Sequence, residues 1–186
     1  MDHIKNAIEK SVRYENPWEF HTIENAFPAG FYQELLDSPM NWAPAQVGHR
    51  TVWLLNGAKK HPWSTARDIL SSQNIVSAFN LATRTKGGHA IPRVNVDAVG
   101  YRLRVHPDIS SKVGTISINL CSDAAPDWGL VINGQPQAIF LPFEPNSGYF
   151  FRRTAQSMHS VRRVAIGGRT SLMVPIFRAK TPRWRV

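Results

Sequence analysis

TISINL, residues 115–120, alternates strictly between polar and apolar side chains. Successive side chains of a β-strand point to opposite faces of the sheet, so Ile116, Ile118 and Leu120 share one face and the three polar residues share the other. Two interpretations are open. The polar face could meet water, as in an ordinary surface strand. Alternatively, the strand belongs to a jelly roll backed by helices, with its apolar face against the helices and its polar face lining the interior.

Short strand patterns separated by turns surround this stretch from Ile91 onward. The turn residues include Asn133-Gly134 and Gly167-Gly168, which favour chain reversals between strands. Together with residues 115–120, these strand patterns give about eight closely spaced strands. The other candidates are Val94–Ala98, Tyr101–Val105, Gly129–Ile132, Ala138–Phe140, Tyr149–Arg152, Ser160–Val164 and Thr170–Phe177.

Helical patterns dominate the chain up to about Lys86, interrupted by loops that contain Trp and Pro. Helix candidates are residues 31–36, Ser64–Ser72 and Asn74–Thr85, and the first ten residues form a polar helix or tail. Helices followed by many strands predict an α+β fold, a jelly roll with N-terminal helices packed on one sheet. We expect a single domain, 1–186, in which a helix-rich part, 1–90, supports a jelly-roll core, 91–178.

Composition bounds the function classes. The 186 residues are 42% hydrophobic and 19% charged, which is typical of a globular protein. No apolar run reaches the roughly 20 residues of a membrane span, and no apolar signal core is found at the N-terminus. Cys121 is the single cysteine, which excludes an internal disulfide and a Cys-based zinc site and leads us to expect a cytoplasmic protein.

The net charge is positive, +9 from 22 Lys+Arg against 13 Asp+Glu. This favours anionic partners, although moderate basicity also serves solubility alone. The basic residues are scattered and no block of five or six like charges occurs. A nucleic-acid-binding arm is therefore not indicated, and neither is a membrane surface.

His106-Pro107-Asp108 is the only His-x-Asp sequence in the chain. In an extended segment the side chains at i and i+2 project to the same side, so both could bind one Fe(II), Mn(II) or Zn(II) ion. The alternative is a turn in which Pro107 fixes φ and Asp108 caps the backbone. A third histidine, His159, follows some 50 residues later at the start of a strand pattern. This favours the metal interpretation.

Ten positions after His159 come Arg169, Thr170 and Ser171. Here the sequence resembles the 2-oxoglutarate- and Fe(II)-dependent dioxygenases of the prolyl-hydroxylase-like group, whose pattern is His-x-Asp, a distal His, and Arg-x-Ser about ten residues on. The segments that flank these motifs also resemble the family, and the resemblance extends from Val94 to Phe177. The matching flanks are Gly100-Tyr101-Arg102-Leu103, Lys112, Trp128-Gly129-Leu130 and the turn Phe143–Gly148.

The resemblance implies a double-stranded β-helix fold, Fe(II) as cofactor and 2-oxoglutarate as cosubstrate. Two His and one carboxylate occupy one face of an octahedral ion and leave three positions open. Arg169 would bind the distal carboxylate of 2-oxoglutarate through its planar fork, and Ser171, on the same strand face, would donate a hydrogen bond to it. The metal ligands that the resemblance implies are His106, Asp108 and His159.

Asn119 occupies a position where many relatives have a tyrosine that contacts the cosubstrate. Asn can also donate a hydrogen bond but is shorter, so its contact could pass through water. The alternation of residues 115–120 agrees with an inward side chain at this position.

The activity that the resemblance implies is hydroxylation of an unactivated C–H bond with O2, while 2-oxoglutarate is converted to succinate and CO2. Related halogenases replace the metal-binding carboxylate by a small residue, whereas here Asp108 is present. Hydroxylation, or a variant such as desaturation, is therefore favoured over halogenation.

Strand alternation also bears on the substrate. If His106 and Asp108 point inward in a regular strand, so do Arg102 and Arg104, and Arg163 shares the inner face with the distal His. Arginines near the metal would favour a small anionic substrate. The alternative is that strand twist or a bulge carries them to the solvent-exposed rim.

Three other functions remain open. The first is a nucleic-acid demethylase with the same chemistry, but alkylation-repair demethylases usually carry a second Arg six residues after the first, where this chain has Pro175. The second is a peptide or protein hydroxylase. The third is a jelly-roll binding module without a metal. The sequence does not indicate an oligomeric state.

Overall fold

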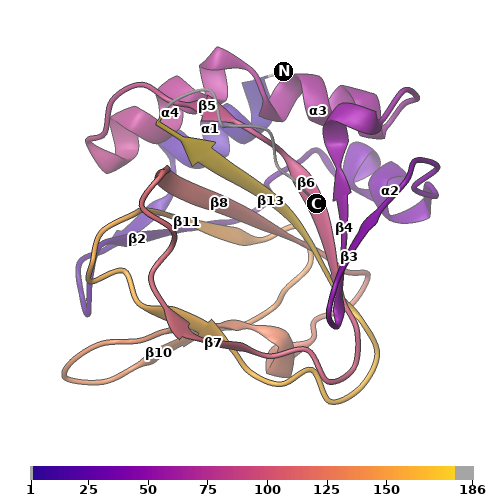
Figure 1. The fold of residues 1–186 in the computed structure, drawn as a ribbon. Helices are drawn as coiled ribbons and strands as arrows, with labels where there is room; N and C mark the ends of the chain where they lie inside the picture. The colour runs from indigo at the N-terminus through magenta and orange to yellow at the C-terminus, as the bar shows by residue number, and fades with distance from the viewer. Residues whose placement is uncertain (1, 179–186) are drawn as a thin grey trace.

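Two antiparallel β-sheets face each other across the interior of the molecule (Figure 1). The computed structural model describes residues 2–178. The major sheet has the strand order β1-β2-β11-β8-β13-β6-β4-β3, with β5 also paired to β13. Its strands are β1 (Val12–Tyr14), β2 (Phe20–Ile23), β3 (Ala45–Val47), β4 (Arg50–Leu54), β5 (His89–Ala90), β6 (Arg93–Asp97), β8 (Lys112–Leu120), β11 (Gly148–Arg152) and β13 (Arg169–Phe177).

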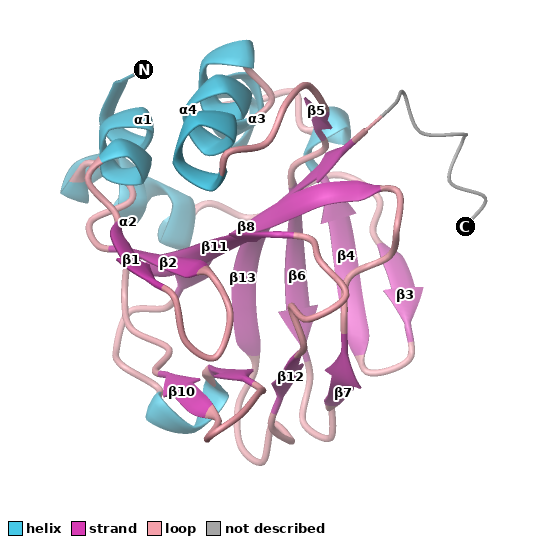
Figure 2. Cartoon of the chain, turned by 90° about the vertical axis from the view of Figure 1, so that its left-hand side faces the viewer, coloured by secondary structure: helices cyan, strands magenta, loops and turns pink. Residues whose placement is uncertain are grey.

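The minor sheet has four strands in the order β10-β9-β12-β7. These are β7 (Leu103–His106), β9 (Leu130–Ile132), β10 (Ile139–Leu141) and β12 (His159–Val161). The helices lie together at the outer face of the major sheet, as Figure 2 shows. They are α1 (Asp2–Glu9), α2 (Ala29–Asp37), α3 (Trp63–Leu70) and α4 (Gln73–Thr83), with short 3-10 turns η1 (Leu55–Gly57) and η2 (Pro126–Trp128).

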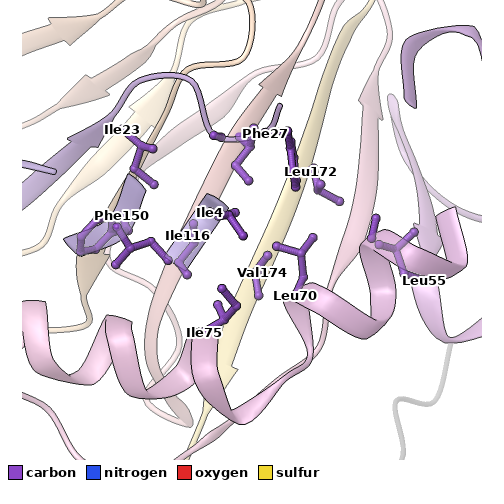
Figure 3. Packing of buried hydrophobic residues seen from close by; sticks show 14 of the residues in the cluster. Ile4, Ile23, Phe27, Leu55, Leu70, Ile75, Ile116, Phe150, Leu172 and Val174 are labelled. Atoms are coloured by element: carbon purple, nitrogen blue, oxygen red, sulfur yellow. The ribbon is translucent and has the colours of Figure 1, made fainter. Parts of the chain in front are cut away.

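The main hydrophobic core lies between the helices and the major sheet (Figure 3). Ile116 on β8 and Leu172 and Val174 on β13 are fully buried against side chains from the helices, among them Leu70 and Ile75. Each such side chain contributes about 1.5–3 kcal/mol through its burial. This core fixes β8 and β13 as the rigid centre of the sheet.

The opposite face of β8 points into the space between the two sheets. Thr115, Ser117 and Asn119 are all buried, although each is polar. The jelly-roll interpretation of residues 115–120 is therefore confirmed, and the surface-strand interpretation is wrong. A second, smaller apolar cluster, which includes Phe151 and Leu130, joins the two sheets from inside.

The elements expected from the sequence agree with the structure in its second half, where all eight strand candidates overlap observed strands. The three helix candidates correspond to α2, α3 and α4, and the first residues form α1, which buries Ile4 and Ile8. The helix-rich part, 1–90, also holds strands β1 to β5, which the sequence analysis did not predict. Residues 1 and 179–186 of the predicted domain lie outside the described residues.

No helix within residues 2–178 combines the length and the apolar character that crossing a bilayer requires.

Cys121 follows β8 and is held by the phenol of Tyr32, which donates a hydrogen bond to the Cys121 carbonyl at 2.8 Å. Burial raises the pKa of the Cys121 thiol to about 11. Because the thiolate is the reactive form, alkylation of the native protein by iodoacetamide near pH 8 is expected to be roughly 100-fold slower than that of the unfolded chain. The rate should rise about tenfold per pH unit up to the pKa of this thiol. Mass spectrometry across a pH series measures this rate; equal native and unfolded rates would contradict the prediction.

Candidate metal centre

Three side chains from two distant parts of the sequence converge between the sheets. His106 ends β7, His159 begins β12, and the two are directly paired across the minor sheet. Asp108 follows two residues after β7. One potential ligand atom from each of the three lies within 4.8 Å of the others, and the imidazole centroids are 4.5 Å apart. This spacing brings all three groups within reach of one ion.

Both imidazoles are oriented by backbone carbonyl groups. The Nδ1 of His106 lies 2.9 Å from the carbonyl oxygen of Arg104, and the Nδ1 of His159 lies 3.0 Å from that of Ser157. A carbonyl only accepts, so each Nδ1 carries the proton and each Nε2 keeps its lone pair for a metal. Burial lowers the pKa of His159, which favours the neutral, ligating form.

The carboxylate of Asp108 is held at both oxygens. Lys112 donates to Oδ1 and the Thr115 hydroxyl donates to Oδ2, each at 2.6 Å. Burial by itself would raise the pKa of Asp108, but the Lys112 ammonium and the two hydrogen bonds lower it below its usual value. Asp108 is therefore ionised and fixed in orientation. Each oxygen has a lone pair left for a cation, so the three side chains fit a divalent metal of the Fe(II), Mn(II) or Zn(II) type.

The guanidinium of Arg169 is buried near these three side chains. Arg169, at the start of β13, is only 2% exposed, and it lines one small internal cavity together with Asp108 and His159. Its Nη1 donates to Asp97 at 3.0 Å and its Nε donates to the Trp128 carbonyl at 2.7 Å. The guanidinium also stacks over the Phe143 ring. It is thus pre-oriented before any ligand arrives.

Several buried polar atoms facing this interior have no hydrogen-bond partner among residues 2–178. They include Ser171 Oγ and Asn119 Oδ1, which lie on directly paired positions of β13 and β8. Ser117 Oγ and Asn95 Oδ1 are in the same condition on neighbouring positions of the sheet. Buried polar groups are nearly always satisfied, so this row fits a polar ligand or water molecules between the metal site and Arg169.

A scan against models of known protein families finds no match, and neither does a search of curated proteins. Solved structures do match. A prolyl-4-hydroxylase from Pseudomonas putida has a TM-score of 0.70 at 10% identity, covering 95% of this chain and 100% of that one. A 2OG-Fe(II) oxygenase family protein from Burkholderia pseudomallei has a TM-score of 0.66 at 14% identity, covering 86% and 84%. HygX from Streptomyces hygroscopicus, with nickel and 2-oxoglutarate bound, has a TM-score of 0.66 at 9% identity, covering 89% and 85%.

The fold is that of the 2-oxoglutarate- and Fe(II)-dependent oxygenases. The prediction of an α+β, double-stranded β-helix fold is confirmed by these similarities and by the two facing sheets. The resemblance seen in the sequence is confirmed at the level of the fold. At identities of 14% and 10% these similarities show the fold alone.

The structure brings the six residues predicted for metal and cosubstrate to the interior between the sheets. The three predicted metal ligands come from the minor sheet and the segment after β7, whereas the three predicted cosubstrate residues come from the inner face of β8 and β13. The six are His106, Asp108, His159, Arg169, Ser171 and Asn119.

The inward orientation predicted for Arg102 and Arg104 is wrong, because both side chains are exposed. Their strand pairs with β12 through His106↔His159 and Leu103↔Val161, a step of three residues on one strand and two on the other. This β-bulge adds a residue to β7, so Leu103, which lines the cavity, takes the inner position. Arg163 is also exposed, since β12 ends at Val161. The bulge alternative, in which these arginines meet solvent, is the one observed.

Other charged residues near the site were not found by sequence reasoning. Asp97, on the inner face of β6, is fully buried and accepts hydrogen bonds from both Arg169 and Arg50. Arg50, on β4, binds Asp97 through Nε and Nη2 and stacks over the Tyr101 ring. The alternation Arg93-Val94-Asn95-Val96-Asp97 was a signal for this inner polar face, but only the pairing of β4 with β6 shows what it meets.

Proposed function

We propose that the protein is an Fe(II)- and 2-oxoglutarate-dependent oxygenase that hydroxylates an unactivated C–H bond of a small, anionic molecule. The observation that carries the proposal is the convergence of His106, Asp108 and His159 on one point, with Arg169 on the same cavity. The similarity of the whole fold to oxygenases, one of them solved with nickel and 2-oxoglutarate, supports the choice of metal and cosubstrate.

Within this proposal His106, Asp108 and His159 hold Fe(II), and Arg169 with Ser171 holds the distal carboxylate of 2-oxoglutarate. Asn119, beside Ser171, adds a polar contact. When bound, the iron and 2-oxoglutarate together with O2 supply the oxidising equivalents for hydroxylation, with release of succinate and CO2. The chain's own part is to orient both imidazoles through their Nδ1 atoms, to hold Asp108 ionised, and to exclude water from the site by apolar side chains such as Phe151.

Charge supports the cosubstrate assignment. Asp97 neutralises one of the two guanidinium groups, of Arg50 and Arg169, that contact it. One positive charge is left for the distal carboxylate of a diacid, which would complete a neutral cluster. Arg169 already points its fork along a fixed direction, so little ordering entropy is lost on binding.

A second candidate, a peptide hydroxylase of the same chemistry, is favoured by the similarity to a prolyl-4-hydroxylase at a TM-score of 0.70. Proline-containing peptides therefore belong in the substrate screen beside small anionic metabolites. A cytoplasmic location is part of the proposal and rests on the single cysteine, Cys121.

The test begins under anaerobic conditions. Fe(II) and 2-oxoglutarate are added to the purified protein, and a weak visible metal-to-ligand charge-transfer band is expected only when both are present. Admission of O2 should then release succinate, and the screen should identify compounds that accelerate it. Normal Fe(II) binding without any binding of 2-oxoglutarate would refute the cosubstrate assignment and with it the function.

A further inference from the structure

Arg93 lies on the inner face of β6. Within this strand Asp97 bonds to Arg50 and Arg169 inside the molecule, whereas Val94 belongs to the core against the helices. Alternation therefore places Arg93, four residues before Asp97, on the inner face as well. Its charge interacts with those of Asp108 and Arg50, which puts the guanidinium on the side of the metal centre.

This guanidinium has no partner among the residues that the structure describes. Its Nε is buried and makes no hydrogen bond, and no ion pair within residues 2–178 involves it. Burial and the neighbouring Arg50 lower its pKa, which reflects an unfavourable environment for an isolated cation. Arg93 is half-buried, and a partly desolvated cation without a partner is destabilising, so a site that keeps one is suited to an anion from outside.

The carboxylates nearby are already engaged. Asp97 is bound by Arg50 and Arg169, and Asp108 is bound by Lys112 and Thr115. Neither oxygen of Asp108 can turn toward Arg93 without breaking one of its 2.6 Å hydrogen bonds. The inner face therefore holds an unmatched positive charge at Arg93.

Arg93 is also separate from the guanidinium assigned to the cosubstrate. It is paired with Met173 on β13, while Arg169 is paired with Asp97, four residues further along β6. Four residues of strand span about 13 Å. Met173 on β13 is paired with Arg93 on one side and with Ser117 of β8 on the other. Ser117 is two residues from Thr115, whose hydroxyl donates to the carboxylate of Asp108. An anion at Arg93 would therefore be close to the metal but distinct from the group that Arg169 holds.

We propose that Arg93 binds the oxyanion group, a carboxylate or a phosphate, of the substrate and so positions the rest of the molecule beside the metal. This role rests on the proposed oxygenase function, and it makes Arg93 the residue that selects an anionic substrate. Arg93 replaces Arg102, Arg104 and Arg163, which are exposed, as the substrate-binding arginine. A guanidinium fork suits both oxyanions because it can donate two parallel hydrogen bonds to either.

The test measures binding directly, without turnover. The protein is loaded with diamagnetic Zn(II) and saturated with 2-oxoglutarate, so that small anions are excluded from the cosubstrate position. Ligand-observed NMR then gives the Kd of propionate and of methyl phosphate, with propionamide as the neutral analogue. At least one anion is expected to bind, while propionamide does not.

Arg93→Met is expected to weaken the binding of that anion at least about tenfold, the effect of losing hydrogen bonds to a charged group. Arg93→Lys keeps the charge and should lose less. Arg162→Met removes an equal charge from an exposed position over Phe140 and should change the Kd by less than about twofold. The affinity for 2-oxoglutarate should be the same in all four proteins.

Thermal unfolding distinguishes this role from a structural one. Removal of an unpaired, partly buried cation should leave Tm unchanged or raise it, whereas loss of a structural arginine lowers it. The proposal is overturned if no anion binds the wild type, if Arg162→Met weakens binding as much as Arg93→Met, or if Arg93→Met weakens 2-oxoglutarate instead. Failure of the oxygenase function itself would be seen separately, as a wild-type protein that does not bind 2-oxoglutarate.

Discussion

Substitution of His159 by Ala is expected to lower the affinity for Fe(II) by more than about 100-fold, because loss of groups that merely orient a ligand already costs 10- to 100-fold. Succinate release should fall below detection in the same protein. The imidazole is buried, is fixed by the Ser157 carbonyl, and contributes one of three converging ligand atoms. Equilibrium dialysis against Fe(II) under anaerobic conditions measures the first effect, and succinate analysis measures the second.

A matched control is His49→Ala, which removes an exposed imidazole from the loop between β3 and β4. It should bind Fe(II) as the wild type does. Asp108→Asn adds a second test, since it keeps the shape of the side chain but removes the charge that the metal and Lys112 share. Unchanged Fe(II) affinity in both His159→Ala and Asp108→Asn would show that these residues do not form a metal site.

Substitution of Arg169 by Met is expected to weaken 2-oxoglutarate binding at least about 100-fold, since two hydrogen bonds to a charged carboxylate would be lost. It should also lower the free energy of unfolding by about 1–3 kcal/mol, because the buried hydrogen bonds to Asp97 and to the Trp128 carbonyl disappear. The loss stays below the cost of an isolated buried carboxylate because Arg50 still binds Asp97 through two nitrogens.

Two measurements separate these effects. Titration of the anaerobic Fe(II) protein with 2-oxoglutarate reports the binding, and urea unfolding reports the stability. Arg169→Lys keeps the charge without the planar fork and should recover part of the stability but little of the affinity. A variant that loses stability and binds 2-oxoglutarate normally would make Arg169 a purely structural residue.

The strands of the second half were predictable because their signals are local. Alternation in residues 115–120 and turn residues such as Asn133-Gly134 specify strands without reference to any other segment. Strands β2 and β4 were missed because their sequences, Phe-His-Thr-Ile and Arg-Thr-Val-Trp-Leu, do not alternate cleanly between polar and apolar residues. They are strands because β11 and β6 offer them free edges, which is a property of the assembled sheet.

In the candidate site, too, some features follow from the local sequence and others depend on how the strands assemble. His106 and Asp108, and likewise His159 and Arg169, are close in the sequence, so both spacings could be read directly. The exposure of Arg102 and Arg104 depends on a bulge, which exists only as a mismatch between two paired strands. Likewise, the ion pair of Asp97 with Arg50 joins two residues that are 47 positions apart in the sequence, and neither local sequence predicts it.

The sorting of β8 and β13 into an apolar face and a polar face has a consequence for redesign of this protein. The apolar side chains of these strands pack against the helices. The polar side chains on the opposite face, including Ser117 and Ser171, have hydroxyl groups without hydrogen-bond partners and contribute little to stability. Selectivity could thus be remodelled from the inside by exchanging Ser117, which has no part in the proposed cosubstrate site, for a residue of other size or polarity, at small risk to folding. Natural diversification of such a barrel would be free to follow the same route.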